Sequence, residues 1–273
     1  MRIRVRHETA YAYSKPARRL SQRLRLTPRG HAGQHVIDWH VGVDLDCALA
    51  ATEDAFGNLV HRLETPGPVG AVTLVAEGTV ELADTLGVVR GAPERFPAEL
   101  FLRASPLAKA DAAISEFAAE FARGRRDRLD RLHALMAAIN ARMAFDAEAT
   151  HVATSAPEAF ALRRGVCQDF AHVFIAAARL LDAPARYVAG YYLRADGVEE
   201  PAGHAWAEAY VEDLGWVGFD ATHGVCPGER HVRVAVGLDY LDAAPVRGVR
   251  EGGGEETLGV ALTVADAAAA AQQ

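Results

Sequence analysis

The chain has 273 residues, of which 50% are hydrophobic and 24% are charged, and its mean hydropathy is close to zero. This composition excludes a disordered or fibrous protein, and the length fits one large or two modest domains. The net charge of −7 argues against a nucleic-acid-binding protein and is typical of a soluble enzyme.

The sequence lacks the usual signals for export or membrane insertion. No apolar run reaches the roughly 18 residues needed to cross a bilayer, and Met1–Ser14 has no apolar stretch or small-residue cleavage site of a signal peptide. We therefore expect a cytoplasmic protein with no membrane partner. Its three cysteines, Cys47, Cys167 and Cys226, are too few and too far apart for a disulfide framework.

Residues 1–95 are predicted to form an antiparallel β-sandwich-like domain. Apolar residues recur with a period of two, as in Ile37, Trp39 and Val41, and turn-forming residues separate the runs. Basic residues are dense between Arg2 and Arg29. They predict a solvated strand face, with a dock for an acidic partner as the alternative.

Helices are predicted from residue 96 onward, where a second domain begins. Ser105-Pro106 should cap a first helix that runs to Gly124, and Asp127 should cap a second one. A short third helix is expected to start at Ser155 and to end near Gly165.

The second domain continues with a helix that begins near Cys167 and ends before Pro184. Strands are then expected at 185–193, 205–211 and 216–220, and further strands at 233–237 and 258–264. These elements complete a domain over residues 96–265, followed by a tail at 266–273.

Cys167 is the candidate nucleophile because it lies at the start of a helix. The free N–H groups and the macrodipole of a helix N-terminus favour a thiolate, and the same N–H groups can stabilise an oxyanion. Gly165 permits a tight turn before the helix, and Asp169 and His172 make this end of the helix unusually polar. A buried structural cysteine is the alternative.

A thiol nucleophile also needs a base, and His204 is the best candidate. The period of the strand places His204 on the face opposite a row of alanines, at the beginning of the strand. The next strand ends in Asp220, which could orient the imidazole.

These three segments together resemble the transglutaminase-like, papain-fold superfamily. The matching residues are Gly165-Val-Cys-Gln-Asp-Phe-Ala-His172, Gly203-His-Ala-Trp-Ala-Glu208 and Gly215-Trp-Val-Gly-Phe-Asp-Ala-Thr222, in the order of the family. The first domain resembles the N-terminal β-domain of bacterial members, notably at Asp54-Ala-Phe-Gly-Asn58. Family members usually have proline after the aspartate, where this chain has Ala221.

The resemblance implies an α+β fold, in which a papain-like core with helices packed on an antiparallel sheet follows the β-domain. It also implies Cys167 as nucleophile, His204 as general base and acid, and Asp220 as the orienting acid. The strand register leaves a rival for Asp220, because a tight turn near Asp213 would set Asp220 opposite Ala207 or Glu208, roughly 10 Å along the strand from His204. Glu208 is that rival.

Three further interpretations concern the site. Pairing of Cys167 with His172 is disfavoured, because five helical residues leave the two side chains roughly 140° apart. A metal set of Asp220, His223, Cys226 and His231 resembles no standard zinc site, so we expect no metal and no other cofactor. The sequence does not identify the second hydrogen-bond donor to the oxyanion, for which His151 and Asn140 are the candidates.

The sequence therefore predicts a cysteine-dependent enzyme that transfers an acyl group from a peptide or protein amide through a thioester. Hydrolysis, as by a peptidase or amidase, is favoured because the C-terminal β-domains of calcium-dependent cross-linking members are absent from this sequence. The alternatives are a cross-linking transglutaminase and a non-catalytic binding module on the same scaffold. The substrate sequence and the oligomeric state are not predicted.

Overall fold

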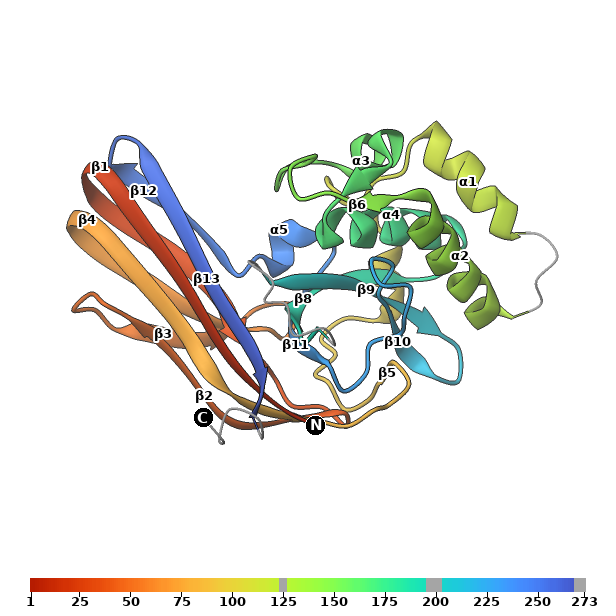
Figure 1. Ribbon diagram of the computed structural model, residues 1–273, viewed down its shortest axis with the longest axis horizontal. Coiled ribbons are helices and arrows are strands. Elements are labelled where there is room, and N and C mark those ends of the chain that lie inside the picture. Colours follow the sequence, from red (N-terminus) through yellow and green to blue (C-terminus); the bar gives the residue numbers. More distant parts are fainter. Residues whose placement is uncertain (123–126, 195–202, 268–273) are drawn as a thin grey trace.

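The computed structural model describes residues 1–122, 127–194 and 203–267, which form two units lying side by side (Figure 1). One unit is built of long strands, and the other packs helices on a smaller sheet. Both main sheets are antiparallel, as the sequence predicts, so the fold class is α+β.

The first unit is organised around two long strands that pair with each other over most of their length. Shorter strands then flank the central pair on both sides, in the order β12-β1-β4-β2, with β13 on β1 and β3 on β4. The strands are β1 (Arg2–Thr27), β2 (Gln34–Val43), β3 (Leu49–Glu53), β4 (Leu59–Leu82), β12 (Val246–Gly252) and β13 (Glu256–Asp266).

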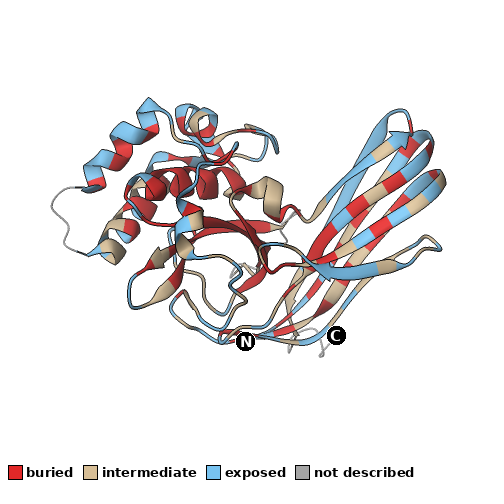
Figure 2. Cartoon of the chain, turned by 180° about the vertical axis from the view of Figure 1, so that it is seen from behind, coloured by how far each residue is buried: buried red, intermediate tan, exposed pale blue. Residues whose placement is uncertain are grey.

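Both long strands are irregular near their middle, where the pairing of β1 with β4 shifts register between Ala12 and Ala17. Residues from the two halves of the sheet meet in one apolar core, in which Val72 and Leu74 of one half join Leu20 and Leu24 of the other. The unit is therefore sandwich-like, with buried and exposed residues alternating along the strands (Figure 2).

The C-terminal strands differ from the expected domain division. Residues 246–266, assigned from the sequence mainly to the second domain at 96–265, pair with β1 in the first unit. Periodicity identifies a strand, but the edge that it joins depends on where the chain returns in space. The first unit thus contains both ends of the described chain, and the second unit is inserted between β4 and β12.

The second unit contains a five-stranded sheet in the order β11-β8-β9-β10-β5. A short parallel pair joins β6 with β7, and β7 directly precedes the helix α4. The strands are β5 (Val88–Val89), β6 (Ala144–Phe145), β7 (Arg164–Gly165), β8 (Ala185–Tyr192), β9 (His204–Val211), β10 (Gly215–Phe219) and β11 (His231–Gly237). The helices are the 3₁₀ helix η1 (Ala98–Leu102) and the α-helices α1 (Ala112–Ala122), α2 (Arg128–Arg142), α3 (Ala156–Leu162), α4 (Cys167–Leu180) and α5 (Tyr240–Ala243).

The capping residues explain where these helices begin. Asp127 caps α2 and Ser155 forms a capping box with Glu158 at α3, both as the sequence predicts. The expected cap of the first helix is wrong. α1 begins at Ala112, where the Asp111 carboxylate accepts the Ile114 N–H, and the Ser105 hydroxyl donates to the Leu238 carbonyl instead.

The helix α4 packs over the centre of the sheet. Ala205, Ala207 and Ala209 of β9 are buried, and their small side chains allow the close approach of a helix. Figure 2 shows this buried layer between the outer helices and the first unit. Among the described residues, none of the helices combines the length and the apolar character of a membrane span.

The basic face of β1 is solvated, and part of it is paired within its own sheet. Arg2 bonds Glu81 and Arg6 bonds Glu77, and all four side chains are exposed. Acidic residues on the neighbouring strand thus pair with these two arginines.

Candidate active site

Cys167 is the first residue of α4, and Val166 precedes it as the N-cap. The Asp169 carboxylate holds this helix start, because its Oδ2 accepts the Val166 N–H at 2.8 Å and the Thr150 hydroxyl at 2.6 Å. Gly165 has no positive φ here; it is needed because a Cβ would lie 2.8 Å from Asp169 Cγ. The glycine therefore makes room for the carboxylate and does not form a left-handed turn.

The thiol of Cys167 faces the beginning of β9. Its Sγ lies 4.0 Å from the carbonyl oxygen of Gly203, the residue directly before His204, and the thiol contributes to the pKa of the His204 imidazole. The N–H groups of Cys167 and Gln168, in the first turn of α4, have no intrahelical acceptor. A helix start of this kind can place an oxyanion beside the thiol.

Asp220 meets the other side of the same imidazole, with 2.8 Å between His204 Nε2 and Asp220 Oδ2. The observed register pairs Phe219 with Ala207, so Asp220 follows the last pair of the ladder and lies diagonal to His204. Diagonal neighbours on one face of a sheet are within reach of long side chains. The structure thus brings Cys167, His204 and Asp220 together at the edge of α4 and the sheet.

The charges of the buried pair support each other. Burial lowers the pKa of His204, but the charge and hydrogen bond of Asp220, with a further contribution from Cys167, outweigh it and raise this pKa to about 10. Burial also opposes ionisation of Asp220, yet His204 and two further histidines hold the pKa of that carboxyl well below its usual range. The pair is therefore held as an imidazolium and a carboxylate.

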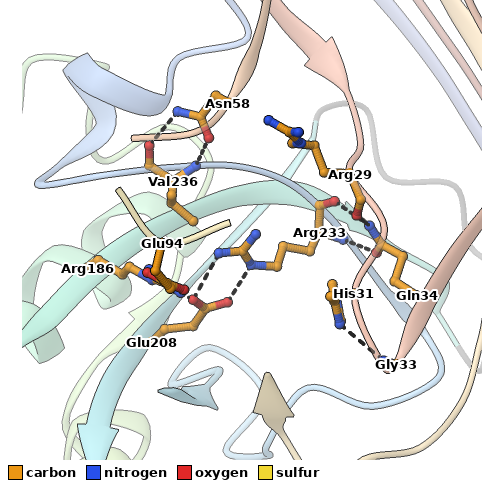
Figure 3. Close-up of polar contacts among 10 residues, drawn as sticks. All are labelled: Arg29, His31, Gly33, Gln34, Asn58, Glu94, Arg186, Glu208, Arg233 and Val236. Atoms are coloured by element: carbon orange, nitrogen blue, oxygen red, sulfur yellow. Dashed lines mark hydrogen bonds and ion pairs between the residues drawn. The ribbon is translucent and has the colours of Figure 1, made fainter. Parts of the chain in front are cut away.

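Glu208, the rival orienting acid, is engaged elsewhere. Its carboxylate is fully buried and bonds Arg186 Nε and Arg233 Nε, each at 2.7 Å, while Arg186 also bonds Glu94 (Figure 3). Although burial raises its pKa, the two guanidinium groups lower it to about 2. Glu208 therefore ties strands together and does not contact His204.

Two histidines that the sequence suggested only as part of an improbable metal set converge on Asp220. His223 Nδ1 lies 2.7 Å and His231 Nε2 lies 3.2 Å from the Oδ2 that also bonds His204. The other oxygen, Oδ1, accepts the backbone N–H groups of Thr222 and His223. The local signal was only for the turn, because an aspartate side chain after a strand commonly accepts backbone N–H groups of the next residues.

The ligand atoms of His204, Asp220 and His231 all lie within 4.8 Å of one another. His204 Nε2 and His231 Nε2 both lie within hydrogen-bond distance of Asp220 Oδ2, so we interpret the cluster as hydrogen-bonded. Cys226, the other member of the metal set considered from the sequence, has its Sγ 3.5 Å from His133 Nε2.

The remaining candidates have structural partners. His172 is buried, its Nε2 accepts the Tyr240 N–H, and burial lowers its pKa to about 4, so it is not the base for Cys167. Asn140 Nδ2 donates to the carbonyls of Ala221 and Thr222, which uses both of its hydrogens. Asn140 therefore fixes the loop after Asp220 and is not free to bind an oxyanion.

Comparisons with known proteins agree with this architecture. A model of the transglutaminase-like superfamily matches residues 115–221, and a model of the bacterial transglutaminase-like N-terminal region matches residues 3–81. An uncharacterized protein of Mycobacterium leprae is 30% identical over 285 residues, covering 96% of this chain and 98% of the relative. One from Mycobacterium tuberculosis is 28% identical over 276 residues, covering 91% and 87%.

A solved structure shows the same fold. The crystal structure of a "Putative Cysteine Protease" from Cytophaga hutchinsonii aligns with a TM-score of 0.79 at 24% identity, covering 97% of this chain and 90% of that one. Its likeness extends over both units described above.

Proposed function

Because this chain belongs to the transglutaminase-like superfamily and carries the bacterial N-terminal region of that family, we propose that it transfers acyl groups from peptide or protein amides through a thioester on Cys167. The observation that carries the proposal is the position of the His204 imidazole, which is hydrogen-bonded to the buried carboxylate of Asp220 and lies at the beginning of β9, next to the thiol at the start of α4.

In the acylation step, the Cys167 thiolate attacks the amide carbonyl carbon, and the carbonyl oxygen becomes an oxyanion. The free N–H groups in the first turn of α4 stabilise that charge. The imidazolium of His204 then gives its proton to the leaving nitrogen, the C–N bond breaks, and the amine departs. Asp220 keeps the ring oriented toward the sulfur throughout.

In the deacylation step, neutral His204 removes a proton from the acceptor, which attacks the thioester carbonyl. The C–S bond then breaks, and Cys167 leaves as the thiolate beside the imidazolium. Water as the acceptor gives a carboxylic acid, and an amine gives a new amide. We favour water, and the name of the Cytophaga hutchinsonii protein is consistent with that choice.

We place the activity in the cytoplasm, where a catalytic thiol is kept reduced. All three cysteines are free in the structure. The proposed partner is a peptide or protein that presents an amide, with no nucleic acid and no membrane lipid involved.

The acceptor is tested by incubating the protein with a glutamine-containing peptide in the presence of a primary amine, with and without a chelator. We expect free acid to exceed the amine conjugate and the rate to be unaffected by the chelator, while Cys167→Ala forms neither product. Strict calcium dependence with mainly amine conjugate would favour the cross-linking alternative. Tight peptide binding by wild type without any product would favour a binding module.

A further inference from the structure

The strand β11 forms one edge of the second unit's sheet, where it pairs with β8 on one side. Its other side faces the first unit. The pairing with β8 shifts register between Arg233 and Ala235, so the strand contains a bulge. The extra residue of a bulge changes which backbone groups point outward, and here both Arg233 and Val236 present their N–H and C=O to the first unit.

Two carboxamides of the first unit pair with this open edge. Gln34 Oε1 accepts the Arg233 N–H and Gln34 Nε2 donates to the Arg233 carbonyl, both at 2.8 Å. Asn58 makes the same two bonds, also at 2.8 Å, with the backbone of Val236 (Figure 3). Both side chains are buried. They therefore satisfy β11 as a neighbouring strand would.

Each carboxamide is also fixed within its own unit. Gln34 Nε2 donates to the Arg29 carbonyl at 2.8 Å, and Asn58 Nδ2 donates to Asp54 Oδ2 at 3.1 Å. These bonds within the first unit fix the orientation of both carboxamides, which therefore define where β11 lies relative to that unit.

His231 begins β11, two residues before the position held by Gln34. Its Nδ1 accepts the Gly228 N–H at 3.4 Å, and a backbone N–H can only donate. The proton of neutral His231 is therefore on Nε2, which points at Asp220 Oδ2 from 3.2 Å. Burial lowers the pKa of His231, which favours this neutral form. The geometry makes His231 a fixed donor to the carboxylate that orients His204.

We propose that His231 is a positioning residue that holds the Asp220 carboxylate against His204, and that the first unit positions His231 by pairing Gln34 and Asn58 with β11. This inference rests on the proposed function and deepens it, because it gives the β-domain a part in the catalytic geometry. Neither His231 nor the two carboxamides touch the reacting atoms. They act through Asp220.

The test compares His231→Phe, which keeps a ring but removes the donor, with His231→Gln, which retains an N–H donor. Gln34→Ala removes the first-unit contact, and Gln22→Ala is its control, because Gln22 is a buried glutamine of β1 that pairs with β4 and β12. We expect kcat/KM to fall about tenfold for His231→Phe, which corresponds to ~1.4 kcal/mol and matches a hydrogen bond to a charged group. His231→Gln should recover most of that loss.

Two readouts separate positioning from a merely structural role. The pKa of His204, measured by NMR titration, should fall in His231→Phe and in Gln34→Ala but not in Gln22→Ala. In addition, Gln34→Ala should lower kcat/KM several-fold less in the His231→Phe background than in wild type. If Gln34 acts through His231, its replacement has little further effect once the His231 donor is gone.

The proposal is overturned if the folded His231→Phe protein keeps both the wild-type pKa of His204 and the wild-type pH profile, or if the Gln34 and His231 effects are additive. The NMR titration needs no substrate. A pKa of His204 that responds as expected in a protein without turnover would therefore refute the proposed function and leave the positioning role standing.

Discussion

Replacing Asp220 by asparagine tests the orienting carboxylate directly. Both oxygens of Asp220 act only as hydrogen-bond acceptors. Oδ1 accepts two backbone N–H groups, and Oδ2 faces the ring nitrogens of three histidines. An amide NH₂ in either place sets donor against donor. Asp220→Asn thus removes the charge and also strains the local hydrogen bonds.

The magnitude follows from the pKa of His204, which lies near 10 against an ordinary 6.5. That difference is worth roughly 5 kcal/mol of preference for the imidazolium, most of which depends on Asp220. Without the carboxylate, burial dominates and the pKa of His204 should fall by about 2 or more. We expect kcat/KM to drop by about 10² or more, with the basic limb of its pH profile moved to lower pH.

The assay is kcat/KM against pH on a cleaved peptide, together with circular dichroism to verify folding. Asp239→Asn is a matched control, because Asp239 is also a buried acid that accepts backbone N–H groups, at Leu107 and Leu241, and is not hydrogen-bonded to His204. Glu208→Gln gives a second comparison and should mainly affect stability. If Asp220→Asn folds and retains the wild-type basic limb, the assignment of Asp220 is refuted.

Three further outcomes are expected. Iodoacetamide at neutral pH should label Cys167 well before Cys47 or Cys226, whose pKa values are raised by burial, and mass-spectrometric mapping that finds three equal rates would contradict the reactive-thiol assignment. The two arginines lower the pKa of Glu208 to about 2, so the ionised carboxylate should contribute roughly 3 kcal/mol to the free energy of unfolding. This contribution should be complete above about pH 5 and lost as the pH falls toward 2. Urea titrations of wild type and Glu208→Gln should therefore differ in their pH dependence between about pH 5 and pH 2. Gly165→Ala should destabilise the fold by about 1–3 kcal/mol in thermal melts, because its Cβ meets a hydrogen-bonded carboxylate, and an unchanged Tm would show that the carboxylate can move.

Local patterns predicted most of the second unit's elements. The caps at Asp127 and Ser155, and the strands on either side of Asp213, follow from residue type and periodicity alone. The start of α1 could not be predicted in this way, because Ser105-Pro106 and Asp111 are both acceptable caps. The choice between them depends on the Leu238 carbonyl, which comes from a distant part of the chain.

In the candidate site too, local sequence predicts some of the residues, and tertiary contacts decide the others. Chemistry on single elements indicated Cys167 and His204, but Asp220 and Glu208 could not be separated by counting residues around a turn. The observed register brings Asp220 one residue closer to His204 than the nearer of the two expected registers. Arg186 and Arg233, which are distant in sequence, engage Glu208. The convergence of His231 on Asp220 depends on β11, whose placement is set by another unit.

The pairing of β13 with β1, from Ile3 with Asp266 to Tyr13 with Glu256, has a consequence for synthesis on the ribosome. The strand β1 leaves the ribosome about 250 residues before β13, the strand that covers one of its edges. The inserted unit is therefore synthesised while that edge is still open to other nascent chains. Removing residues 246–266 would make this exposure permanent, and such a truncated chain should self-associate through β1 even though every residue of the thiol site is retained.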